Sequence, residues 1–127
     1  MHPPPTPVQL RIARFLCDVV RASGAWTILS GEEPIVVRAP NEDILLLWPR
    51  REDAARAQRS GWPMLTIGRI DVGTLVEELL PALHRDGVVI GLGSSLRQDA
   101  LVTLPPEWLE RALRAGIERG WSPGPLD

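Results

Sequence analysis

Two short runs constrain the fold of this chain more than any other feature. Residues 44–48 (Ile-Leu-Leu-Leu-Trp) and 88–92 (Val-Val-Ile-Gly-Leu) carry apolar or small side chains at every position. Successive side chains of a β-strand point to opposite faces of its sheet, so strands of this kind must be covered on both faces. We expect both runs in the middle of a sheet with helices packed on its faces.

Amphipathic helices are predicted around these strands. Apolar residues recur at helical spacing in 8–20, 72–83 and 109–117, which puts one stripe of each helix against a core. Asp71 is a good N-cap for the second of these helices, and Pro81 should kink or tighten its last turn.

Further strands and one short helix complete the expected elements. A hairpin is predicted from 25–29 and 34–38, a strand at 64–70 and a short edge strand at 101–104. A helix should run from Pro49 to about residue 60. Crossovers from 44–48 to 64–70 and on to 88–92 should be right-handed, which makes these three strands parallel.

The predicted fold class is therefore α+β (a mixed α/β sandwich), a single domain whose mixed sheet has four to five strands. A chain of 127 residues is long enough for one such core. Residues 1–7, with four prolines, are predicted to be a flexible arm, 8–120 the domain and 121–127 a C-terminal tail.

Composition narrows the function classes. The chain has 14 basic residues, all arginine, against 16 acidic ones, for a net charge of −2, which argues against a general nucleic-acid binder. One cysteine provides neither a disulfide framework nor a zinc cluster, and we expect no cofactor and no metal. The N-terminus does not resemble a signal peptide, and no apolar run approaches the length of a membrane span. The expected location is the cytoplasm, without a membrane partner.

The segment from Gly91 to Ser95 follows a buried strand, as a phosphate-binding loop would. A dinucleotide fingerprint needs a third glycine and a helix directly after it, whereas position 96 is leucine and helical spacing resumes only near residue 105. An exit loop is the favoured interpretation, and a ligand-binding loop that includes Ser94 and Ser95 is the alternative.

Residues that could support catalysis are few. Ser94, Ser95, Asp99 and His84 are the only set from which a Ser-His-Asp arrangement could be assembled. His84 falls in the last turn of a predicted helix, where capping free carbonyls explains it better. Cys17 lies close to an apolar stripe and is expected to be a buried, inert thiol.

Arginines and tryptophans provide the remaining candidate binding residues. Arg50, Arg51 and Arg56 lie on the helix that begins near Pro49, and Trp62 follows its end. Clustered arginines fit an anion or an acidic partner, although a solvated face with salt bridges is the commoner explanation. An exposed tryptophan is typical of interaction sites, and a loop tryptophan also often covers its own core. Trp26 and Trp48 are expected in the core.

Three motifs carry a family resemblance: 47–52 (Leu-Trp-Pro-Arg-Arg-Glu), 79–91 with Leu-Leu-Pro-Ala-Leu and Asp-Gly-Val-Val-Ile-Gly, and 106–109 (Pro-Glu-Trp-Leu). In this order they resemble the bacterial family "domain of unknown function 2750" over residues 15–113. The resemblance implies a small stand-alone bacterial domain and no assigned activity. The loop after Gly91 departs from the pattern expected of the family.

These observations favour a non-catalytic cytoplasmic module that binds another protein, of a regulatory or immunity type. Its predicted surface comprises Arg50, Arg51, Arg56, Trp62 and the 94–99 loop. The alternative is a small-molecule or phosphate-ligand domain, or a small enzyme, that uses the loop beginning at Gly91. Self-association into a homodimer through an edge strand is a third hypothesis.

Overall fold

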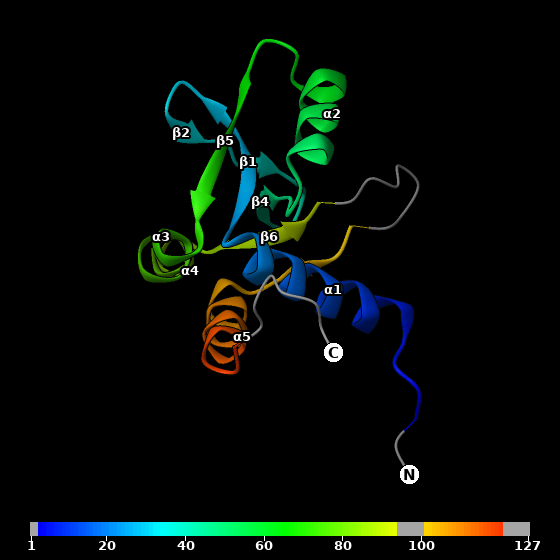
Figure 1. The fold of residues 1–127 in the computed structure, drawn as a ribbon. Helices are drawn as coiled ribbons and strands as arrows, with labels where there is room; N and C mark the ends of the chain where they lie inside the picture. Colours follow the sequence, from blue (N-terminus) through cyan, green and yellow to red (C-terminus); the bar gives the residue numbers. More distant parts are fainter. Residues whose placement is uncertain (1–2, 94–100, 121–127) are drawn as a thin grey trace.

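Strands form two small sheets in the computed structural model, which describes residues 3–93 and 101–120 (Figure 1). The three-stranded sheet is antiparallel and has the order β2-β1-β5. The four-stranded sheet has the order β3-β4-β6-β7, with β4 and β6 parallel and the other pairs antiparallel. The strands are β1 (Gly24–Ser30), β2 (Glu33–Pro34), β3 (Val37–Arg38), β4 (Asp43–Leu47), β5 (Thr66–Asp71), β6 (Val88–Leu92) and β7 (Thr103–Leu104).

Helices cover these sheets, and local signals determine where they begin. Thr6 and Gln9 form a reciprocal capping box at the start of the first helix. The Asp71 side chain accepts a hydrogen bond from the Gly73 amide at 2.9 Å, which confirms the predicted N-cap. The helical segments are α1 (Pro7–Ala22), α2 (Arg51–Gly61), α3 (Val72–Thr74), the π-helical turn η1 (Leu75–Leu79), α4 (Leu80–Asp86) and α5 (Pro106–Glu118).

Pro81 perturbs its helix, but it does so by widening the turn before it and not by tightening the last turn as expected. Segments α3, η1 and α4 follow one another without a break, and at their centre the Leu80 amide donates to the Leu75 carbonyl, five residues back. Proline cannot donate a hydrogen bond and crowds the preceding turn. The wider π turn immediately before Pro81 accommodates it without ending the helix.

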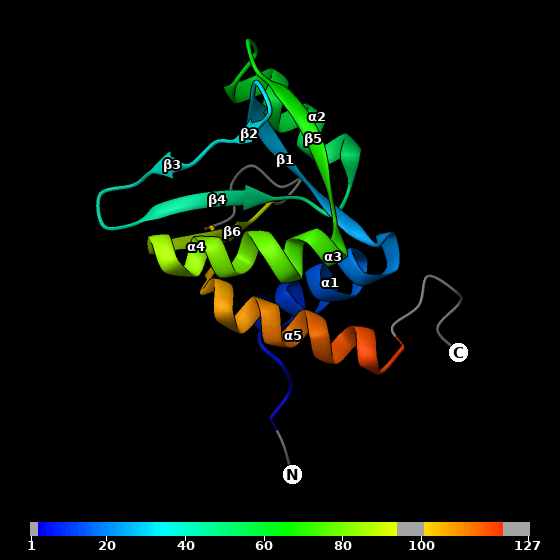
Figure 2. The same ribbon diagram turned by 90° about the vertical axis from the view of Figure 1, so that its left-hand side faces the viewer.

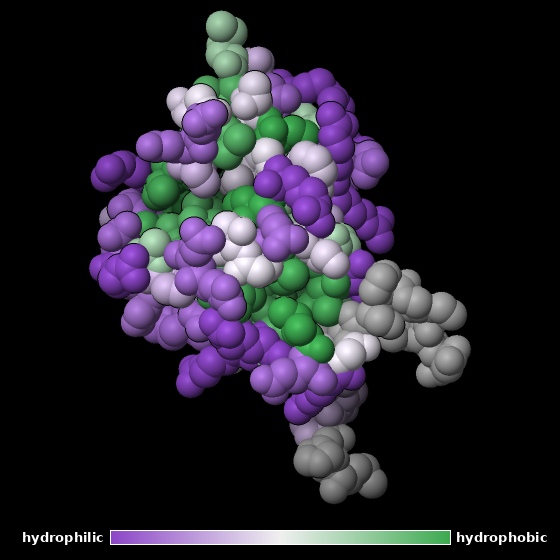
Figure 3. Space-filling view, turned by 60° about the vertical axis from the view of Figure 1, so that its left-hand side comes forward, coloured by the Kyte–Doolittle hydropathy of each residue, from purple (hydrophilic) through white to green (hydrophobic). Residues whose placement is uncertain are grey.

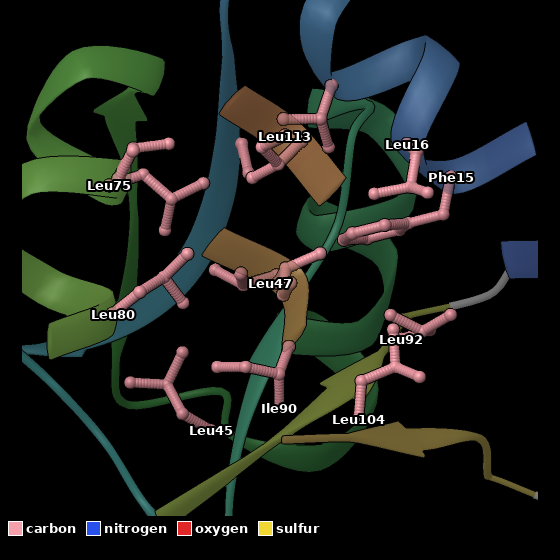
Figure 4. Packing of buried hydrophobic residues seen from close by; sticks show 14 of the residues in the cluster. Phe15, Leu16, Leu45, Leu47, Leu75, Leu80, Ile90, Leu92, Leu104 and Leu113 are labelled. Atoms are coloured by element: carbon pink, nitrogen blue, oxygen red, sulfur yellow. The ribbon is translucent and has the colours of Figure 1, made fainter. Parts of the chain in front are cut away.

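The main core lies between the four-stranded sheet and helices α1, α4 and α5 (Figures 1 and 2). The two fully apolar strands, β4 and β6, are neighbours at the centre of this sheet, as predicted. Figure 4 shows Leu47 and Ile90 meeting side chains from the helices. The fully buried members of this cluster include Val19, Leu45, Leu47, Leu75, Leu80, Ile90, Leu109 and Leu113. The predicted α+β domain with a mixed sheet is confirmed.

Two pairing expectations are wrong. Strand β5 was expected to run parallel to β4 and β6 in one sheet, but it pairs antiparallel with β1 in the other sheet, and β4 pairs with β6 directly. The expected strand over 34–38 divides into β2 and β3, which belong to different sheets. The short Ile35–Val36 link between them lets one extended segment serve both sheets.

The two sheets meet at the start of β1. Trp26 and Trp48 form an isolated antiparallel bridge in which each amide donates to the other's carbonyl, at 2.6 and 2.8 Å. Beside this bridge the Thr27 hydroxyl donates to the Leu46 carbonyl at 2.7 Å. Thr27 is 1% exposed and is a buried polar side chain whose hydrogen bond joins the sheets.

Replacing Thr27 by valine keeps the side-chain shape and removes this hydrogen bond. We expect the free energy of unfolding to fall by about 1–2 kcal/mol, because the bond to Leu46 is lost inside the protein. Urea denaturation measures the change. Thr66→Val, at an exposed position of β5, is the matched control and should change stability by less than about 0.5 kcal/mol. Equal stability of both variants would contradict a structural role for the hydroxyl.

Candidate functional site on helix α2

Helix α2 rests on the three-stranded sheet through small side chains. Ala54 and Ala55 are buried on its inner face, and Ala54 belongs to a second, smaller core with Ile28 and Trp48. Alanine allows the helix backbone to approach the sheet closely. The helix follows β4 almost directly, after Trp48 and Pro49. The arginines of this helix are exposed, and we give the name α2 face to the surface formed by Arg50, Arg51, Arg56 and Trp62.

Arg51 is the most clearly positioned of these residues. Its guanidinium carbon lies 5.7 Å from the centroid of the Trp26 ring, within the range of a cation–π contact. Trp26 is only partly buried, packed against the smaller core. The expectation that Trp26 belongs to the core is therefore correct only in part, because one side of its ring supports an arginine.

The other arginines differ in their surroundings. Arg56 forms an ion pair with Asp53, three residues earlier in the helix, and 3.7 Å separates a guanidinium nitrogen from a carboxylate oxygen. The Arg56 side chain is 62% exposed. An exposed pair of this kind contributes little to stability. Arg50 is the N-cap residue of α2, is exposed and makes no side-chain capping bond. Glu52 and Asp53 in the first turn offset the positive charges there.

Trp62 directly follows the C-terminal end of α2, where hydrogen bonds to its carbonyl and packing against the smaller core fix its position. The Gln58 side chain donates to the Trp62 and Leu65 carbonyls at 3.1 and 2.9 Å, and the Leu65 amide donates to the Trp62 carbonyl. The indole is partly buried against the smaller core. Trp62 therefore covers its own core, and only part of the ring remains for contact with a partner.

The glycines in and directly after the end of β6 have packing roles. A Cβ atom on Gly93 would lie 2.3 Å from Cδ1 and Nε1 of Trp48, and one on Gly91 would lie 2.8 Å from side-chain atoms of Ile44 and Leu46. The Gly93 amide donates to the Leu47 carbonyl at 2.7 Å. Close packing and a backbone bond therefore account for both glycines. Ser94 and Ser95, the other predicted binding residues, lie outside the described residues, as does Asp99.

The remaining candidates for chemistry lie apart. His84, near the end of α4, has its Nδ1 atom 3.2 Å from the Glu107 carboxylate at the start of α5, with both side chains about half exposed. Cys17 is a free thiol, partly buried rather than fully buried as expected. Within residues 3–93 and 101–120, no group of three or more His, Cys, Asp or Glu is arranged to hold a metal ion.

The length and apolar character of the helices decide whether any of them could span a membrane. None of those described, of which α1 is the longest at 16 residues, has the length and apolar character needed to cross a bilayer.

Comparison with known proteins identifies one relationship. A family model described as "Protein of unknown function (DUF2750)" matches residues 12–113, which include α2, both sheets and most of α5. No curated protein matches the sequence.

Proposed function

The chain belongs to the DUF2750 family of proteins of unknown function, and we propose that this member is a non-catalytic module that binds another protein through the α2 face. The partner is a protein with an acidic surface, and the binding is regulatory or immunity-type in character. The cytoplasm is the compartment in which we propose that it acts.

The charge of α2 is the observation that carries this proposal. Residues 50–61 contain four arginines and two carboxylates, whereas the whole chain has a net charge of −2. The helix is therefore a positive element on a negatively charged protein. Such a surface steers acidic partners toward one orientation and speeds their association.

Arg51 supports the proposal through its geometry. Stacking on the Trp26 ring restrains a side chain that would otherwise lose much rotational freedom on binding. Arginine and tryptophan are also the residues most enriched among those that dominate binding energy at protein interfaces. The pair provides a preorganised cation, with Arg50 exposed beside it and Arg56 farther along the helix.

Affinity capture from lysate of the native host, read by quantitative mass spectrometry, tests the proposal. The bait variant Arg50→Ala, Arg51→Ala, Arg56→Ala should recover the specific partner at least about tenfold less than the wild-type bait, because arginines at interface hot spots contribute strongly to affinity. Raising the salt concentration should weaken recovery by the wild type in the same direction.

The matched control removes the same charge elsewhere. Arg85, Arg111 and Arg119 are exposed and lie away from α2, and their triple alanine variant should recover the partner as the wild type does. Unfolding curves of both variants verify that each is folded. Equal recovery by all three baits, or no specific partner for any of them, would contradict the proposal.

A further inference from the structure

Strand β5 has an open edge whose free backbone groups can be identified. The Val72 amide donates to the Ser23 carbonyl, and hydrogen-bonded pairs alternate along an antiparallel ladder. In the observed register, Ile70 and Gly68 therefore bond to β1, whereas Ile67 and Arg69 direct their amides and carbonyls away from it. The order β2-β1-β5 places no strand on that side among the described residues.

The other edge strands are too short, or too interrupted by proline, to pair readily with another chain, whereas β5 is not. Strands β3 and β7 are two residues long, and β2 is equally short and ends in Pro34, all of which limit pairing with other chains. Strand β5 has six residues and no proline. Its only basic side chain, Arg69, is turned away to donate to the Ala22 and Ser23 carbonyls at 2.8 and 2.9 Å. The guanidinium group of Arg69, which could otherwise hinder pairing at this edge, instead caps the C-terminal end of α1.

We propose that a second copy of this chain pairs with this edge, β5 against β5, antiparallel about a two-fold axis at Gly68. In this register Ile67 of each copy lies opposite Arg69 of the other, and each such pair can exchange both of its hydrogen bonds. Gly68 meets its own counterpart where the strands approach most closely, and it has no side chain to clash. The two three-stranded sheets become one continuous sheet of six strands.

The neighbouring registers are less favourable. A shift of the axis to Arg69 places two guanidinium-bearing residues opposite each other. A shift to Ile67 requires backbone groups of Leu65, but its amide already donates to Trp62 and its carbonyl already accepts from Gln58. The axis at Gly68 uses Ile67 and Arg69, whose outward backbone groups pair with no strand among the described residues.

Met64 provides an independent observation for the same arrangement. Its side chain is 92% exposed, the most exposed of the large hydrophobic residues in the described chain. It lies in the turn that precedes β5, which protrudes at the top of the molecule and has an apolar tip (Figures 1 and 3). In the register about Gly68, the turn that carries Met64 in one copy lies at the end of the shared ladder, where β5 of the other copy passes into α3. The dimer would thus remove this apolar side chain from water.

Analytical ultracentrifugation of the full chain, from about 1 µM to about 1 mM, tests the proposal over the range of weak self-association. The wild type should pass from monomer to dimer. Arg69→Pro removes the outward amide without removing a bond to β1 and should remain monomeric. Arg69→Ala, the matched control, loses the same side chain but keeps the amide, and should still dimerise. Met64→Glu, at a position where folding is not at risk, should weaken the dimer by at least about tenfold.

Amide hydrogen exchange locates the interface. Exchange at Ile67 and Arg69 should slow as the protein concentration rises, whereas exchange at Gly68 and Ile70, already bonded to β1, should change little. A wild type that stays monomeric over the whole range would overturn the proposal, as would binding of a different protein to the edge of a monomer. A dimer in which Met64→Glu has no effect and these two amides are unaffected would place the interface elsewhere and would overturn it too.

Discussion

Replacing Leu47 by alanine is expected to lower the free energy of unfolding by about 2–5 kcal/mol. Leu47 is fully buried at the centre of the four-stranded sheet, where Figure 4 shows it among side chains that include Leu75, Leu80 and Ile90. Truncation removes apolar contacts and leaves a cavity, because the side chains around this position come from β6 and from the helices on one face of the sheet and cannot all collapse together. Chemical denaturation monitored by circular dichroism measures the loss.

The control is a leucine in a different environment. Leu10 on α1 is 50% exposed, and Leu10→Ala should change stability by no more than about 0.5 kcal/mol. The contrast separates cavity formation from the general effect of replacing leucine. A Leu47→Ala protein as stable as the Leu10→Ala protein would show that the core is not packed as described.

Gly93→Ala is expected to reduce stability by about 1–3 kcal/mol through overpacking. The added methyl group would overlap the edge of the Trp48 indole, and Trp48 is 3% exposed and cannot move outward freely. The indole ring is rigid, and its backbone is fixed by the bridge to Trp26. In addition to denaturation, the indole N–H resonance of Trp48 in an NMR spectrum should shift in this variant, because the new methyl group abuts that atom.

Gly61→Ala is the matched control for this substitution. A Cβ atom at Gly61 would meet no heavy atom within 4 Å, and the residue ends α2. Alanine there should leave stability unchanged or raise it by up to about 1 kcal/mol, since it restricts the unfolded chain and favours the helix. A Gly93→Ala protein that matches Gly61→Ala, with an unmoved Trp48 resonance, would refute the packing role.

Patterns confined to one element of the sequence predict the fold well. The apolar runs that became β4 and β6 could only be central strands, and the Asp71 cap and the hairpin of β1 and β2 follow from local chemistry. Which strand pairs with which depends on residues far apart in the sequence, and a pattern within one element does not indicate it. One signal was present for β5: Thr66, Arg69 and Asp71 make it polar at several positions, unlike β4 and β6, which fits a half-buried edge strand better than a position between two apolar strands.

The candidate site was predictable in part for the same reason. Arg50, Arg51 and Arg56 are close in sequence, so a helix over 51–61 places all three on one element, although Arg51 and Arg56, five residues apart, point in different directions. The support of Arg51 by Trp26 depends on α2 packing over β1, a contact between residues 25 positions apart that no spacing rule indicates. The role of Gly93 was also hidden, because a glycine in a serine-containing loop resembles a ligand-binding segment until Trp48 is seen to occupy the space beside it.

The bridge between Trp26 and Trp48 has a consequence for how the protein opens. It is the isolated β-bridge seen between the two sheets in the described part of the chain, and the region beyond it has only the smaller core around Ile28 and Ala54. Less apolar surface holds that region closed, and local opening follows the regions with least buried surface. Ala25 and Ile70 anchor one end of the three-stranded sheet in the main core, whereas α2 and the other end of the sheet can open at a lower free energy. Limited proteolysis should therefore cleave the chain first in α2 and the strands packed around Ile28 and Ala54.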